Sequence, residues 1–227
     1  MTEEITAEGA PAPLCDTSDM LLVHALLRRI YRDAPGLVES VPVGDTARAA
    51  IVADHVETFT RFLHHHHHTE DVTIWDKLSA RTPACAVHVA LMRAHHKRVG
   101  ELLGELEESI PAWRAGASHQ DAESVARRIR AVNEVLFDHL GQEEAKILPA
   151  IAQSWSQEEW DAVGKRAAKG IRASQFPVLL GFLLETMPEE ERPQLLRQAP
   201  AMVRVIYRLY GRRQFDAYRR RVYGLAA

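Results

Sequence analysis

Two histidine–glutamate pairs carry the residues of this chain that are best suited to metal chemistry. His66 and Glu70 lie in the stretch FLHHHHHTEDVTIW, residues 62–75, and His139 and Glu143 repeat their HxxxE spacing 73 positions later. In a helix, residues at i and i+4 project from one face, about 5.4 Å apart along the axis. An imidazole and a carboxylate placed in this way can bind one cation or two adjacent cations.

The apolar residues around the two pairs repeat at the same spacing. Val52, Val56, Phe59, Leu63 and Ile74 correspond to Val125, Ile129, Val132, Leu136 and Ile147, and Asp71 corresponds to Glu144. Apolar residues recurring every three or four positions predict a buried stripe along each helix. Each HxxxE pair is therefore expected to lie inside such a stripe.

Two further histidines come from the helices that precede these two. A shift of 72 residues superimposes Met20, His24, Leu27 and Ile30 on Met92, His96, Val99 and Leu102. A shift of 71 would pair His24 with His95, but it would place Leu27 on Arg98. The repeat therefore favours His96 over His95. The predicted ligands are His24, His66, Glu70, His96, His139 and Glu143.

The run of five histidines, residues 64–68, cannot face the interior as a whole, because successive helical residues rotate by about 100°. His66 lies on the apolar stripe and His67 at its edge. We therefore predict His66 as the ligand, with His67 as the alternative. The other histidines are predicted to have no ligand role: His64, His65 and His68 on the helix exterior, His55 and His88 as structural residues, and His119 as an exposed one.

The donor set indicates which metals could bind. Two buried carboxylates without opposite charge would cost several kcal/mol, and a cation supplies that charge. Imidazoles with carboxylates suit iron, zinc or manganese better than calcium or magnesium, which prefer oxygen ligands. Two carboxylates can also bridge a pair of metals, as they do in dinuclear helix-bundle sites.

Four helical segments must position these groups. Helical patterns cover residues 19–33, 45–78, 84–109 and 121–152, joined by short breakers and without β-type alternation. The expected fold is all-α, an antiparallel four-helix bundle with an additional C-terminal helical extension. The expected division is a flexible N-terminal tail at 1–15, the bundle at 16–155 and the extension at 156–227.

The extension is expected to contain helices near 157–169, 177–186, 189–197 and 200–222. The sequence SQEEW predicts a capping box at the first of these, with Ser156 as N-cap and Glu159 at N3. The last carries many arginines, which are read as a solvated face, with an electron donor or protein partner as a further possibility.

The composition and the terminal sequence limit the possible partners and the expected location of the protein. The 227 residues carry a net charge of −3, which gives no electrostatic basis for a nucleic-acid partner. Cys15 and Cys85 are too few for a disulfide framework. The first residues lack the pattern of a signal peptide, and no apolar run reaches the roughly 18 residues of a membrane span. A cytoplasmic protein with no membrane partner is expected.

The order H24 … H66xxxE70 … H96 … H139xxxE143 resembles the hemerythrin-like, HHE cation-binding family, over about residues 16–153. The resemblance implies a left-handed four-helix bundle holding two iron ions that cycle between Fe2+ and Fe3+. The two glutamates would bridge the irons together with an oxo or hydroxo group. Zinc and manganese are the alternative occupants.

The sequence departs from the oxygen-carrying hemerythrins at two positions. Their third helix has HxxxH, whereas Met92 and Gly100 stand one turn either side of His96, and their fourth has HxxxxD in place of HxxxE. A missing imidazole would leave an open coordination position, as catalytic metals do. Tyr31, two turns after His24, is considered as a hydrogen-bond donor to the centre, a replacement ligand or a core residue.

These departures favour an oxidoreductase that acts on nitric oxide, hydrogen peroxide or dioxygen over a reversible oxygen carrier. The main alternative is a non-enzymatic sensor or store of oxygen or iron. A third is an interaction domain with an incidental metal.

Overall fold

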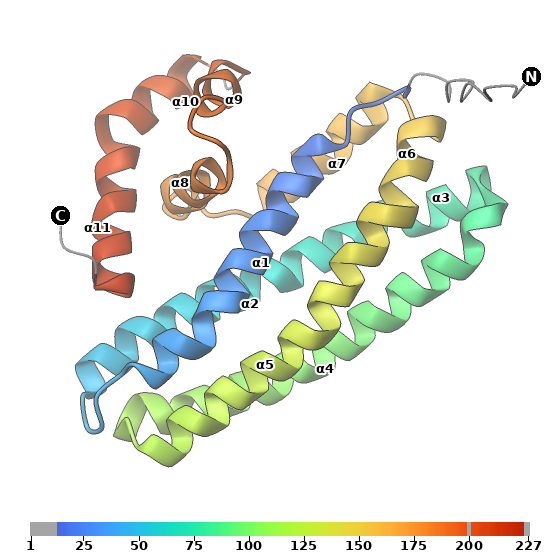
Figure 1. Cartoon of the computed structure of the whole chain (residues 1–227). Helices are drawn as coiled ribbons and strands as arrows, with labels where there is room; N and C mark the ends of the chain where they lie inside the picture. The colour runs from blue at the N-terminus through green and yellow to red at the C-terminus, as the bar shows by residue number, and fades with distance from the viewer. Residues whose placement is uncertain (1–12, 199–200, 225–227) are drawn as a thin grey trace, which may run out of the picture.

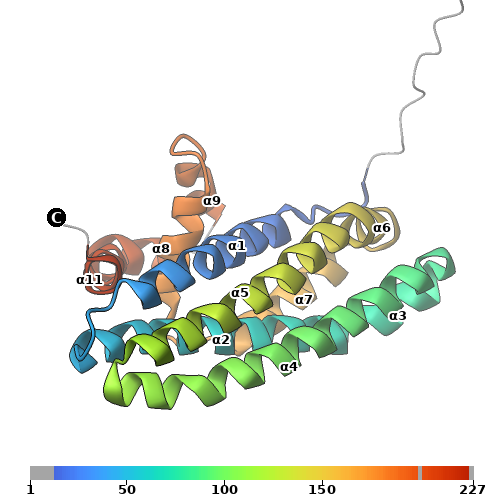
Figure 2. The ribbon, with the colours of Figure 1, turned by 60° about the horizontal axis from the view of Figure 1, so that its bottom comes forward.

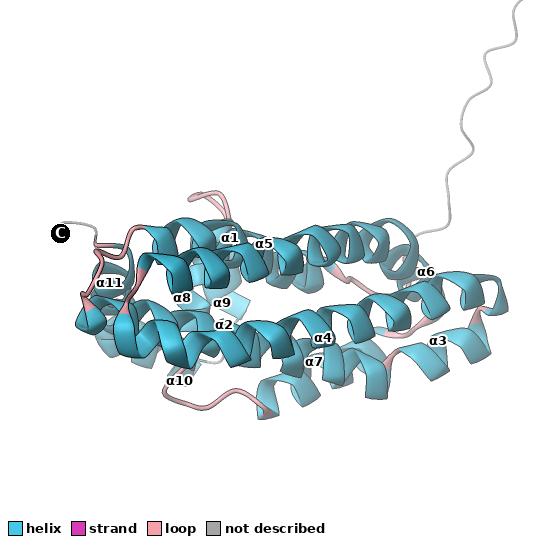
Figure 3. Cartoon of the chain, turned by 90° about the horizontal axis from the view of Figure 1, so that it is seen from below, coloured by secondary structure: helices cyan, strands magenta, loops and turns pink. Residues whose placement is uncertain are grey.

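The computed structural model describes residues 13–198 and 201–224, and these form helices joined by short loops, without a strand in the described ranges (Figure 3). The bundle consists of α1 (Ser18–Glu39), α2 (Thr46–Thr73), α4 (Ala86–Gly116) and α5 (His119–Gln142). Each of these helices packs beside its neighbours in the order α1, α2, α4, α5, and α5 closes the bundle against α1 (Figures 1 and 2). The predicted all-α fold with additional C-terminal helices is confirmed.

The internal repeat extends to the ends of the helices. α2 begins at Thr46 and α5 begins 73 residues later at His119. Each is preceded by a residue whose side chain caps it: Asp45 accepts from the Arg48 amide, and Ser118 accepts from the Asp121 amide. These side chains satisfy amides that have no partner within the first turn.

The repeat also extends to the irregular parts of the helices. The helical path loosens at Ile74 (φ −104°, ψ −55°) and at Ile147 (φ −91°, ψ −54°), which are 73 residues apart. Two seven-residue helices follow, α3 (Trp75–Arg81) and α6 (Leu148–Ser154). A short 3-10 turn, Pro83–Cys85, then leads from α3 into α4. The two halves of the bundle are thus related in backbone as well as in sequence.

Two bundle helices continue beyond the breakers that were expected to end them. α1 runs through Pro35 to Glu39, and α4 runs through Pro111 to Gly116. A proline inside a helix costs about 3 kcal/mol. The added turns bury Val38 and Trp113 completely, and this burial offsets the cost.

The buried core is divided by a polar layer. One apolar cluster includes Leu27, Leu63, Val99 and Leu136, and the other includes Met20, Ile74, Met92 and Ile147. Along each helix the histidines and glutamates of the predicted site lie between members of the two clusters. The predicted site is therefore enclosed by apolar packing on both sides.

The extension consists of α7 (Gln157–Lys169), α8 (Phe176–Thr186), α9 (Arg192–Gln198), α10 (Ala201–Ile206), a π-helical segment (Tyr207–Gly211) and α11 (Arg212–Tyr223). The capping box of Ser156 and Glu159 is present at the start of α7. α7 contacts α2, α8 contacts α1, and α11 contacts both α2 and α8. Figure 1 shows α8 to α11 on the α1 side of the bundle.

The extension shares the core of the bundle. Phe182 of α8 and Phe215 of α11 belong to the same buried cluster as Leu27 and Leu63. Gly181 allows this packing, since a Cβ at that position would collide with the Phe215 ring. Most arginines of α11 are exposed, and Arg219 pairs with Glu185 at 2.9 Å. Within the described ranges, no helix combines the length and apolar character needed to cross a bilayer.

Candidate metal centre

Seven side chains from all four bundle helices meet in the polar layer. Their exposed fractions run from 0% for His24, His139 and Glu143 to 8% for His66. The layer consists of His24 from α1, His66, His67 and Glu70 from α2, His96 from α4, His139 from α5 and Glu143 from the segment after α5. The structure thus brings together all six predicted ligands and adds His67.

Each carboxylate lies between histidines of two different helices. Glu70 Oε1 lies 3.1 Å from His66 Nε2, and Glu70 Oε2 lies 3.3 Å from His96 Nε2. Glu143 Oε2 lies 3.6 Å from His24 Nε2 and 3.5 Å from His139 Nε2. The two glutamates are therefore placed to connect two positions in the layer.

Six of the seven side chains fall into two groups that share one carboxylate, and Glu143 lies outside both groups. His24, His66 and Glu70 form one group, and His67, Glu70, His96 and His139 form the other, with the donor atoms of each group within 4.8 Å of one another. Glu70 belongs to both groups. This sharing is the geometry expected of a dinuclear site.

Most donor atoms of the layer are buried without hydrogen bonds; the exception is the pair of Nε2 atoms of His96 and His139, which lie 3.3 Å apart. Among the described residues, no hydrogen-bond partner is found for Nε2 of His24, His66 or His67, or for either carboxylate oxygen of Glu70 and Glu143. Leaving one buried polar group unsatisfied costs about 1–3 kcal/mol, and more when the group is charged. Cations would satisfy all of these atoms together, so the residues present fit a metal centre.

Two more carboxylates orient the histidines from outside the layer. Asp71 Oδ1 lies 2.8 Å from His96 Nδ1 and also accepts a hydrogen bond from the Trp75 indole at 2.8 Å. Glu144 Oε1 lies 2.9 Å from His24 Nδ1. A carboxylate on Nδ1 fixes the ring so that Nε2 is free to bind a metal.

The guanidinium of Arg28 holds Glu144 with two hydrogen bonds, at 2.5 and 3.0 Å. Although burial opposes ionisation, the contacts with His24 and Arg28 lower the pKa of Glu144 to about 2. Glu144 is therefore ionised at neutral pH and available to accept from His24.

Burial and neighbouring carboxylates together control protonation inside the layer; although burial opposes it, Asp71 and Glu70 raise the pKa of His96 to about 9. Burial lowers the pKa values of His66, His67 and His139 well below the usual histidine range. These imidazoles are therefore neutral, which is the form that binds metals. Burial and the neighbouring Glu70 raise the pKa of Glu143 to about 8, so this carboxyl group needs a nearby positive charge to ionise at neutral pH.

The helix type changes at the second glutamate. Residues Glu143–Ile147 form a π-helical turn between α5 and α6. Such turns are rare in proteins, and those that occur are often found at functional sites. Here adjacent residues contact the two nitrogens of one ring: Glu143 lies beside Nε2 of His24 within the layer, while Glu144 contacts Nδ1 of His24 from outside it.

His67 is the residue whose position was least well predicted. It is 6% exposed, and its ring stacks on His96 with centroids 4.1 Å apart. His66 instead meets His24 edge-on at 5.5 Å. The adjacent histidines thus point toward different neighbouring helices, because the interior arc of α2 is wider than one stripe. The missing HxxxH of the third helix was the available signal that an imidazole should come from elsewhere.

The other candidate residues are placed as follows. His95 is half-buried and lies 3.7 Å from Asp138, outside both donor groups. His64 and His68 are exposed, whereas His65 is half-buried and Nε2 of His65 lies 2.8 Å from the carbonyl of Ala167 in α7. Tyr31 is buried with its hydroxyl near Thr60, and burial raises its pKa well above the usual range.

In a comparison with protein-family models, residues 16–151 of this chain match the hemerythrin HHE cation-binding domain. The matched region contains all seven residues of the layer and more than half of the chain. Searches of curated proteins and of solved structures gave no significant match.

Proposed function

This chain belongs to the hemerythrin HHE cation-binding domain family, and from that premise we propose that the buried layer holds two iron ions and performs redox chemistry on a small molecule. The observation that carries the proposal is the set of buried imidazole and carboxylate atoms without hydrogen-bond partners. His24 and His66 would bind at one position, and His67, His96 and His139 at the other. Glu70 and Glu143 would connect the two.

Iron is proposed over zinc and manganese because mixed imidazole and carboxylate donors suit it and because the family resemblance implies it. An oxo or hydroxo bridge is the expected third connection. When bound, the metals would donate electrons to reduce nitric oxide, hydrogen peroxide or dioxygen, or would accept electrons where the small molecule is oxidised.

The protein contributes orientation and exclusion of water. Asp71 and Glu144 fix the rings of His96 and His24. The apolar clusters above and below the layer limit the access of water along the bundle, which strengthens the electrostatic interactions within the layer. The exogenous molecule is expected at the group with two histidines, because His67 already supplies a third imidazole to the other group.

A sensor or store is the second candidate. The observation that favours it is the contact of His65, next to His66, with Ala167 of α7. A change in the centre could in this way reach the extension without any turnover.

Metal analysis and rapid kinetics test these proposals. Protein purified without added metal should contain two irons per chain, whereas zinc in their place would contradict the redox function. Glu70→Ala should lose both irons, since Glu70 belongs to both groups, and His68→Ala is the exposed control in the same tract. Multiple turnovers with nitric oxide or peroxide in stopped-flow spectra would support an enzyme. A stable, reversible adduct without turnover would support the sensor.

A further inference from the structure

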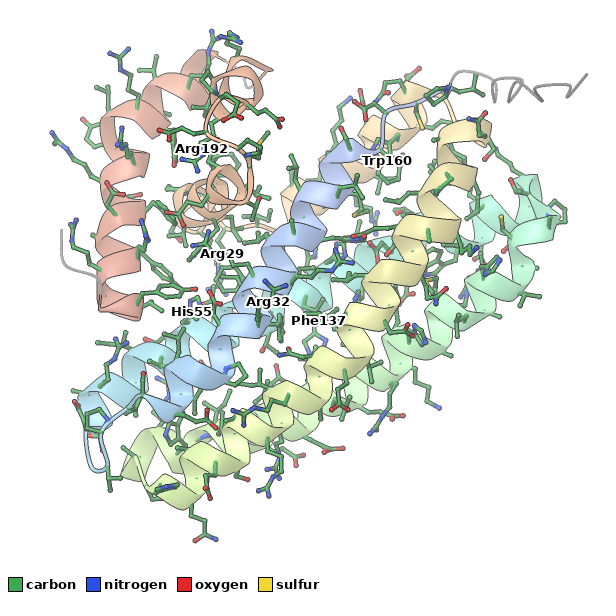
Figure 4. All side chains as sticks on the ribbon, viewed as in Figure 1. Arg29, Arg32, His55, Phe137, Trp160 and Arg192 are labelled. Carbon is green, nitrogen blue, oxygen red and sulfur yellow. The ribbon has the colours of Figure 1, made fainter. Side chains whose placement is uncertain are left out.

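A cavity of about 440 Å³ lies between the bundle and the extension. α1 and α2 form one wall, and α7, α8 and α9 form the other, so the cavity exists only because the extension packs on the bundle. In Figure 4, Trp160 marks the end of this region near the start of α1. The apolar lining includes Met20, Val23, Phe62, Val163, Leu179 and Leu183.

The cavity reaches the polar layer. His66 and Glu70 form part of its wall, and both belong to the donor group with two histidines. The opposite side of the layer opens into a different, polar pocket lined by residues such as His67, Arg93, Lys97 and His96. The two sides of the centre therefore face surroundings of opposite character.

The polar groups in the wall of the apolar cavity either have hydrogen-bond partners or, like His66 and Glu70, belong to the polar layer. Asp19 accepts a hydrogen bond from the Trp160 indole at 2.8 Å, and Nε2 of His65 lies 2.8 Å from the carbonyl of Ala167. Glu70 faces the histidines of the layer. In the part of the chain that the structure describes, no lysine or arginine lines this cavity. A charged ligand would find no partner here, and its desolvation would oppose binding.

Size narrows the class of ligand further. Pockets that enclose organic ligands measure roughly 300–1,000 Å³, whereas a water-sized molecule needs only about 30 Å³. A diatomic gas would leave most of this space unfilled. A peptide segment would bring backbone amides that the apolar wall cannot satisfy.

We propose that this cavity is a binding site for an uncharged, apolar organic molecule, enclosed by the C-terminal extension against a wall that includes His66 and Glu70. The site goes beyond the redox function proposed above and does not depend on which metal the layer holds. It also gives the extension a role, since α7 to α9 supply half of the wall.

Binding of the uncharged fluorophore N-phenyl-1-naphthylamine to the full-length protein tests the proposal. Its emission increases when it enters apolar surroundings, so a titration gives a dissociation constant. Gly164→Phe should weaken binding at least about tenfold, because Gly164 lines the cavity and a Cβ there meets open space, leaving room for a ring to occupy the site. Ala162→Phe is the matched control on α7, at an exposed position outside the lining, and should bind like the wild type.

Val23→Phe fills the cavity from the opposite wall. It replaces Gly164→Phe in the test if thermal unfolding shows that Gly164→Phe does not fold. Loss of binding in the cavity variants with retention in Ala162→Phe supports the site. Absence of binding to the wild type, or equal affinity of a folded cavity variant and the control, would overturn it.

Discussion

The carboxylate of Asp71, the residue directly after Glu70, lies 2.8 Å from Nδ1 of His96. The repeat places Glu144 directly after Glu143, and Glu144 holds Nδ1 of His24 at 2.9 Å. Both α2 and the π-helical segment that continues α5 thus carry a glutamate that enters the layer and an acidic neighbour that orients a histidine on an adjacent helix. The repeated unit is therefore HxxxE followed directly by an acidic residue. That acidic residue contacts a histidine of a neighbouring helix.

Removing that acid should weaken metal binding without removing a ligand. Asp71→Ala is expected to lower metal affinity about 10- to 100-fold, because the His96 ring would lose the partner that fixes its orientation. Competition with a chelator measures the effect. Asp76→Ala, at a side chain that is 96% exposed, is the control. Equal affinities for the two variants would show that Asp71 has no orienting role.

His67 breaks the twofold pattern, since the repeat pairs it with the buried residue Leu140. His67→Leu should therefore fit the interior and raise the free energy of unfolding of the metal-free protein by about 1–3 kcal/mol, because it removes a buried nitrogen without a hydrogen-bond partner. The same change should reduce the metal content from two ions toward one. Urea unfolding and metal analysis give the two readouts. A variant that is unaltered in metal content would exclude His67 as a ligand.

The sequence predicted the fold and the layer because both depend on periodicity. The shift of 73 residues located His66 and His139, and the shift of 72 favoured His96 over His95; the layer contains the favoured residues. Their role as ligands stays a prediction. The helical periodicity placed His67 only at the edge of the buried stripe, because it assumes that a helix has a single buried face. α2 packs against both α1 and α4, so its buried face is wider.

Other features depend on contacts that leave no local pattern. The residues of the π-helical turn, Glu143–Ile147, have a sequence pattern that predicts an ordinary α-helix. The His65 contact with Ala167 joins residues 102 positions apart, so His65 was expected on the helix exterior. The cavity likewise requires α7 and α8 to pack on α1 and α2, which no motif in the extension predicts.

His55 should make stability depend on pH. It is buried among aromatic rings, and its Nδ1 lies 2.9 Å from the Tyr218 hydroxyl of α11. Burial lowers the pKa of His55 to about 3, whereas an unfolded histidine titrates near 6.5. Between these values the unfolded state binds more protons, so the free energy of unfolding decreases as the pH falls below about 6.5.

The contribution of His55 from pH 7 to pH 5 is a loss of about 2 kcal/mol. His55→Gln cannot gain this proton and should lose correspondingly less stability over that range, as measured by urea unfolding at both pH values. His119→Gln, whose side chain is 72% exposed, should follow the wild type. Parallel pH profiles for wild type and His55→Gln would contradict the assignment.

Gly170 should be required for the attachment of the extension to α2. A Cβ at this position would collide with the ring of His65, although the backbone (φ −82°) would accept alanine. Gly170→Ala therefore forces the His65 ring away from the Ala167 carbonyl and should destabilise the protein by about 1–2 kcal/mol. Gly164→Ala is the matched control, since its Cβ meets open space and alanine is the better helix former, so stability should rise by up to about 1 kcal/mol. If thermal unfolding shows the same change for both variants, the close approach of Gly170 and His65 does not hold the extension in place.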